Sequence, residues 1–157
     1  MLSIFLGPLI FFIGVTLLFL LVPRKDISRF WDIGLVGGLG ISFVLTYLMH
    51  NVFGFWNFVG GDIIIYGIPL CLAAVWMPLV MIYSYWVSKS SNLYQIAGVI
   101  AGFALLATAA HWYYVTQGML IFVRWSVFYT FILAVAIHIA LLYYLYASKQ
   151  ITGMHHS

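Results

Sequence analysis

The chain has 157 residues, of which 66% are hydrophobic and only 6% are charged, whereas a soluble domain carries about 25% charged residues. Six Lys/Arg and three Asp/Glu cannot cover a soluble surface, so we expect lipid to surround a single transmembrane domain, residues 1–157. The net charge is +3, but the basic residues fall at predicted helix ends, which excludes a nucleic-acid-binding patch.

The first apolar run covers residues 3–22 and ends at Pro23-Arg24-Lys25. It lacks a basic leading region and an Ala-x-Ala cleavage site, so we expect a retained transmembrane helix and not a signal peptide. Further apolar runs, each of about the 20 residues that cross a bilayer, follow at 33–49, 63–87, 93–115 and 121–147. These runs are continuously apolar, which favours helices over barrel strands. The sequence therefore predicts an all-α polytopic bundle of five transmembrane helices.

The basic residues predict the orientation of this bundle, because loops rich in Lys and Arg stay in the cytoplasm. With the N-terminus outside and the C-terminus in the cytoplasm, five of the six basic residues are cytoplasmic and only Arg124 is outside. We therefore expect a multi-pass protein of the cell membrane with this orientation.

Small residues are spaced for close helix packing in two of the predicted helices. Gly34 and Gly38 lie four residues apart in the second, and Gly98 and Gly102 repeat this spacing in the fourth. Such faces serve packing within one chain, a homo-oligomer, or contact with a larger membrane complex. Membrane lipids are the other expected partners.

The five-helix topology gathers polar and aromatic side chains at the outer membrane face. We predict a candidate ligand site there, formed by His50, Trp56, Asn57, Asp62, His111, Trp112, Gln117 and Arg124. Asp62 begins the third run, where a carboxylate also serves as a helix cap. We further expect Asp62 to pair with Arg124, directly or through a histidine, because an unpaired shielded charge is costly.

His138 lies deeper, on the same stripe as Ser126, Thr130 and Ala134. We expect a buried, neutral side chain that is hydrogen-bonded to a neighbouring helix. Its predicted depth differs from that of His111 by about 16 Å, which argues against one haem ligated by both residues. Ligation of a haem or another pigment by a single histidine is the alternative. The sequence predicts no metal site, although His155-His156 in the tail is a weak candidate, and the single Cys71 fits an inert apolar role.

Several enzyme classes lack their minimum parts. The chain has no Gly-x-Ser-x-Gly elbow, no His-Glu-x-x-His pair and no glutamate. The first hypothesis is therefore binding or transport of a small hydrophobic or amphipathic ligand at the outer-face cluster. The alternatives are a non-catalytic accessory subunit of a larger membrane complex and a membrane enzyme acting on a lipid or isoprenoid, with His111 as acid–base.

Several short motifs resemble those of a known group of membrane proteins. They are Gly54-Phe55-Trp56, Gly67-Ile68-Pro69-Leu70, Trp76-x-Pro78 and the segment 124–130, Arg-Trp-Ser-Val-Phe-Tyr-Thr. Together with a short basic loop after the first run, these resemble uncharacterised small five-span membrane proteins of spore-forming Gram-positive bacteria. The resemblance implies five helices in a bacterial plasma membrane and supplies no catalytic residues.

Overall fold

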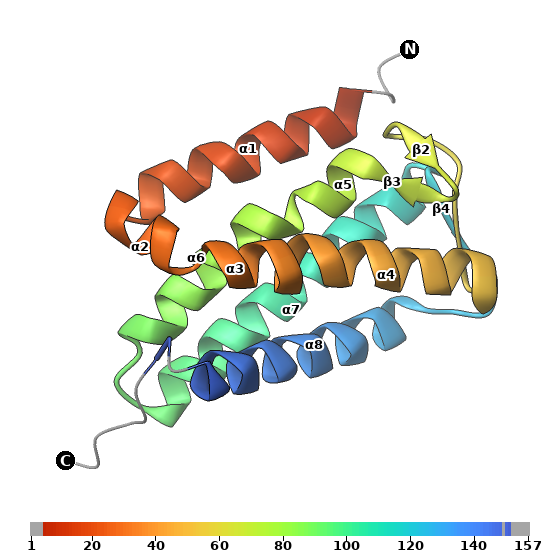
Figure 1. Ribbon diagram of the computed structural model, residues 1–157. Coiled ribbons are helices and arrows are strands. Elements are labelled where there is room, and N and C mark those ends of the chain that lie inside the picture. Colours follow the sequence, from red (N-terminus) through yellow and green to blue (C-terminus); the bar gives the residue numbers. More distant parts are fainter. Residues whose placement is uncertain (1–4, 149, 152–157) are drawn as a thin grey trace.

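The computed structural model describes residues 5–148, 150 and 151, and the chain is mostly helical (Figure 1). Its helices are α1 (Leu6–Leu21), α2 (Arg24–Arg29), α3 (Trp31–Ile33), α4 (Ile41–Tyr47), α5 (Leu70–Ala74), α6 (Trp76–Lys89), α7 (Leu93–Thr116) and α8 (Val127–Ala147). The π-helical segment Gly34–Gly40 joins α3 to α4, and a second one, Leu48–Val52, extends α4, so that Trp31–Val52 is one helical run. The strands are β1 (Trp56–Phe58), β2 (Ile64–Ile65), β3 (Ile68–Pro69) and β4 (Leu120–Phe122).

Four helical runs are long and apolar enough to cross a membrane: Trp31–Val52, Leu70–Lys89, Leu93–Thr116 and Val127–Ala147. The protein is therefore a multi-pass membrane protein. Helix α1 is also apolar but has only 16 residues, about 24 Å at 1.5 Å per residue, against a hydrocarbon core of about 30 Å. It packs along α5 and α6 as part of the same bundle (Figure 1).

Successive long helices run in opposite directions, so the loops gather at two ends of the bundle (Figure 1). The strands and Arg124 lie at one end, which we call the hairpin end. Helix α2, which carries Arg24, Lys25 and Arg29, and the end of α6 at Lys89 lie at the other end, which we call the basic end. There the Gln150 side chain donates to both carboxylate oxygens of Asp32, each at 2.6 Å.

Two helices start later than the sequence predicts. The third was expected from residue 63, but residues 64–69 form the antiparallel pair β2–β3, and the helix begins at Leu70. The two residues of the turn between β2 and β3, Tyr66 and Gly67, have φ angles of 52° and 78°, which are typical of a tight hairpin turn. The fifth was expected from residue 121, but β4 pairs with β1, and α8 begins at Val127. Short apolar runs do not distinguish strand from helix, which explains both differences.

The glycines of the second helical run make its closest contact. A Cβ atom on Gly38 would lie 2.5 Å from the Trp76 carbonyl oxygen and 2.7 Å from Met77 Cα. Gly34 faces Met81 of α6 in the same way. These two glycines therefore serve packing inside the chain. A Cβ atom on Gly98 or Gly102 would meet nothing within 4 Å.

Replacing Gly38 tests this close approach. We expect Gly38→Ala to lower the free energy of unfolding by about 1–3 kcal/mol, because the added methyl group meets backbone atoms that cannot rotate away. Gly40→Ala is the control, since its Cβ atom would meet only the Leu35 carbonyl oxygen at 3.5 Å. Thermal unfolding in detergent measures both variants, and equal stability of the two would show that the helices are not in backbone contact.

Candidate functional site

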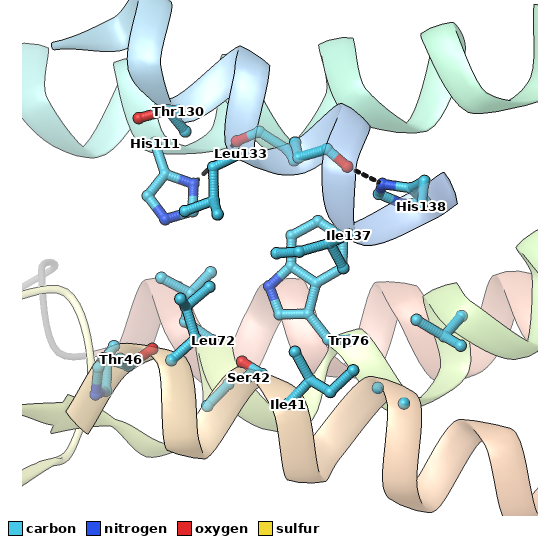
Figure 2. A pocket seen from close by; sticks show the side chains of 18 of the residues that line it. Ile41, Ser42, Thr46, Leu72, Trp76, His111, Thr130, Leu133, Ile137 and His138 are labelled. Carbon is cyan, nitrogen blue, oxygen red and sulfur yellow. Dashed lines mark hydrogen bonds between the residues drawn. The ribbon is translucent and has the colours of Figure 1, made fainter. Parts of the chain in front are cut away.

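A cavity of about 70 Å³ lies inside the bundle, between α4, the α5–α6 run, α7 and α8 (Figure 2). Its walls are mostly apolar, and no charged side chain lines it among the described residues. Its polar or hydrogen-bonding side chains are Ser42, Thr46, Trp56, Trp76, His111, Thr130 and His138. A cavity of this size holds several water molecules or a small molecule of a few heavy atoms.

His111 of α7 forms one wall of the cavity. Its Nδ1 lies 2.9 Å from the Ala107 carbonyl oxygen, one turn earlier in the same helix. A carbonyl only accepts, so Nδ1 carries the proton, and Nε2 of the neutral ring is a hydrogen-bond acceptor. The Trp56 ring packs 5.1 Å from the imidazole, and the buried Trp56 Nε1 has no hydrogen-bond partner in the described part of the chain.

The opposite wall comes from α4 and α6. Ser42 and Thr46 lie one helical turn apart on α4, and Trp76 begins α6. Figure 2 shows the Trp76 indole projecting between the two helix layers, with His111 across the cavity from Thr46. The cavity therefore offers hydroxyl groups and the Trp76 indole on one side and the His111 imidazole acceptor on the other.

His138 of α8 reaches the cavity nearer the basic end. Its Nδ1 lies 2.7 Å from the Ala134 carbonyl oxygen, and its Nε2 is buried without a partner among the described residues. The expected side-chain bond to a neighbouring helix is therefore wrong, although the Tyr83 hydroxyl of α6 donates to the His138 carbonyl at 2.7 Å. The imidazole lies 5.8 Å from the Phe103 ring, between ring centroids. Phe103 precedes His111 by two turns, about 12 Å, so the histidines lie at different depths.

The structure brings together part of the predicted outer-face cluster. His50 Nδ1 donates to the Trp56 carbonyl at 3.0 Å, and Trp56 in turn packs on His111. Asn57 is half-buried on β1, opposite Ile121 of β4. These contacts hold β1 against the cavity, so His50 acts here as a support for Trp56.

The other predicted site residues do not line this cavity. Asp62 is 6% exposed, and its two carboxylate oxygens accept from the backbone N–H groups of Ile63 and Leu72, each at 2.6 Å. Leu72 lies in the first turn of α5, so Asp62 caps that helix. Arg124 is exposed, and no salt bridge joins it to Asp62 in the described chain, so the expected ion pair is wrong. Trp112 is 57% exposed and Gln117 is exposed.

Sequence reasoning missed Ser42, Thr46 and Trp76. Two signals were available: Gly38, Ser42 and Thr46 repeat at the four-residue spacing of one helix face, and Trp76 lies far from the ends of its apolar run.

The described residues contain no group of three or more His, Cys, Asp or Glu that could hold a metal ion. The His155-His156 pair lies outside those residues. The cavity is also much smaller than the roughly 300–1,000 Å³ of pockets for drug-sized ligands, so a haem does not fit unless the helices separate. Comparisons with protein-family models, curated proteins and solved structures found no match.

The cap that Asp62 provides for α5 gives a second prediction. We expect Asp62→Ala to lower the free energy of unfolding by about 1–2 kcal/mol, because it removes the acceptor for the Leu72 N–H group. Arg124→Ala should have little effect, since that side chain is exposed. In thermal unfolding of the double variant, the two changes in free energy should add. A coupling energy above about 0.5 kcal/mol would show that Asp62 and Arg124 interact after all.

Proposed function

We propose that this five-span membrane protein binds a small, neutral, amphipathic molecule in its central cavity. The supporting observation is that two buried polar atoms on residues that line the cavity, Trp56 Nε1 and His138 Nε2, have no hydrogen-bond partner in the described part of the chain, and that His111, with its Nε2 acceptor, lines the same cavity. Buried polar groups in native proteins are nearly always hydrogen-bonded to protein, water or ligand. A ligand with a hydroxyl or amide group would satisfy them.

The chemistry of the walls defines the ligand class. A charged ligand would leave its charge uncompensated, because no acidic or basic side chain lines the cavity among the described residues. A purely apolar ligand would leave the imidazole and indole groups unsatisfied. A neutral molecule with a small apolar body and one donor–acceptor group fits both constraints.

We propose that the N-terminus lies outside and that the basic end faces the cytoplasm. The antiparallel order of the helices and the basic residues at one end support this orientation. On the motifs described above, we also propose membership of the small five-span proteins of spore-forming Gram-positive bacteria.

Labelling of single cysteines tests the orientation. In a Cys71→Ala background, we expect Gln117→Cys to react with a membrane-impermeant maleimide on intact cells, because it lies at the hairpin end. Ser90→Cys, at the basic end, should react only after the cells are permeabilised. The reverse pattern would invert the proposed topology.

Removal of the imidazole tests ligand binding. We expect His111→Phe to reduce the small-molecule content of the purified protein at least about tenfold, because the ring is kept while the Nε2 acceptor is lost; a lost hydrogen bond of about 1.5 kcal/mol suffices for that factor. Mass spectrometry of the released molecules measures the content.

Trp112→Phe is the matched control, because the neighbouring side chain is exposed and does not line the cavity. Both variants should unfold within a few degrees of the wild type. An equal small-molecule content in the wild type, His111→Phe and Trp112→Phe, or none in any of them, would contradict the proposed function.

A further inference from the structure

A second hollow lies on the outside of the bundle, between α1, α6 and α7. It is a groove of about 690 Å³ and shares no lining residue with the central cavity. Leu17 and Leu21 of α1, Trp86 of α6, and Gly98 and Gly102 of α7 line it. The Trp86 ring packs edge-on against the Phe103 ring at 5.8 Å, which closes the groove from the bundle interior.

No described residue fills this groove at its glycine side. Cβ atoms on Gly98 and Gly102 would meet open space, and both glycines are exposed. In a bilayer this surface faces hydrocarbon. An empty groove would forfeit dispersion contacts along its walls, and water there would find few polar partners. A hydrocarbon chain therefore fits the groove.

The length of the groove matches one membrane leaflet. Along α7 its lining runs from Gln95 to Leu106, twelve residues whose ends lie about 16 Å apart along the helix axis. Half of a hydrocarbon core of about 30 Å is nearly the same length. The groove begins at the basic end and stops near the bilayer centre, as an acyl chain of that leaflet does.

Charge at the rim favours a negative headgroup. Lys89 lines the groove at the basic end beside Ser90 and Gln95, and no acidic side chain lines it among the described residues. The Lys89 ammonium lies 5.5 Å from the centre of the Tyr85 ring, so its stem follows the helix surface. On the α1 side, two more basic residues, Arg24 and Lys25, come three and four residues after Leu21.

We propose that this groove binds one anionic phospholipid from the leaflet at the basic end, with an acyl chain against Gly98 and Gly102 and the phosphate beside Lys89. The proposal is independent of the ligand in the central cavity.

Two kinds of variant test the proposal: one fills the groove with larger side chains, and the other removes the charge of Lys89. The wild type is reconstituted in vesicles of equal parts phosphatidylglycerol and phosphatidylcholine, extracted in mild detergent, and examined by native mass spectrometry. We expect one retained phosphatidylglycerol per chain. The double variant Gly98→Leu/Gly102→Leu should retain at least about tenfold less, because a leucine at each site occupies the acyl-chain path; the Cβ atom added at each site meets no protein atom within 4 Å. Ala101→Leu, on an exposed face outside the groove, should retain the wild-type amount.

Lys89→Gln tests the headgroup separately. We expect about a fivefold loss of the preference for phosphatidylglycerol over phosphatidylcholine, the contribution of one basic residue near an anionic surface. This arm decides the proposal even if the double variant does not fold. Unchanged lipid retention in the double leucine variant, or no preference for phosphatidylglycerol in the wild type, would overturn the proposal. A wild-type dimer that the leucines convert to a monomer, with lipid retention unchanged, would show that a second copy fills the groove.

Discussion

The backbone contact between Gly38 and the Trp76–Met77 peptide is the constraint on which the interior depends. Because no side chain separates them, the second helical run packs closely against α6 at Gly34 and Gly38, and the two runs separate toward the hairpin end, where α5 continues from α6. The side chain of Trp76 leaves the backbone at this contact and projects into the central cavity. The glycine contact thus provides both the tight packing near the middle of the bundle and the cavity next to it. The break between α5 and α6 at Val75 lies three residues before Pro78, which cannot donate to the Ala74 carbonyl.

The hairpin end closes the cavity with irregular backbone, which is costly in a membrane unless its polar groups are satisfied. At this end, the backbone groups bond to one another and to nearby polar side chains. Strand β1 pairs with β4, β2 pairs with β3, Asp62 caps α5, and the Asn51 side chain donates to the Tyr66 carbonyl at 2.9 Å. These bonds position Trp56, Phe58 and Pro69 as the lid residues of the cavity. Several polar residues that suggest a ligand site at this end thus serve the backbone.

The number and approximate positions of the apolar helices could be predicted from composition and run length. The strands could not, because residues 63–69 and 120–122 are as apolar as the helices that follow, and β1 pairs with a segment more than sixty residues away. For the site, the sequence places His50, Trp56 and His111 at one end correctly, since chain topology determines the level of a residue. The direction around the helix is harder: Trp112 follows His111 by about 100° of rotation and points outward. A capping role for Asp62 could be predicted, but not that it acts on Leu72, ten residues later and beyond the β2–β3 pair. The lack of an ion pair with Arg124 could not be predicted, because it depends on a distance that the sequence does not contain.

Within the described chain, each imidazole is hydrogen-bonded only to its own helix, through the carbonyl group one turn earlier. Helices α7 and α8 in turn pack against each other along much of their length, so they form one wall that carries both rings. The facing wall of α4 and α6 makes no side-chain hydrogen bond to either imidazole within the described chain. A separation of the two walls would therefore enlarge the cavity without turning either ring. Because the Nδ1 bond of each ring lies within one helix, this anchoring does not depend on the width of the cavity, so molecules of different girth would meet the same anchored nitrogens.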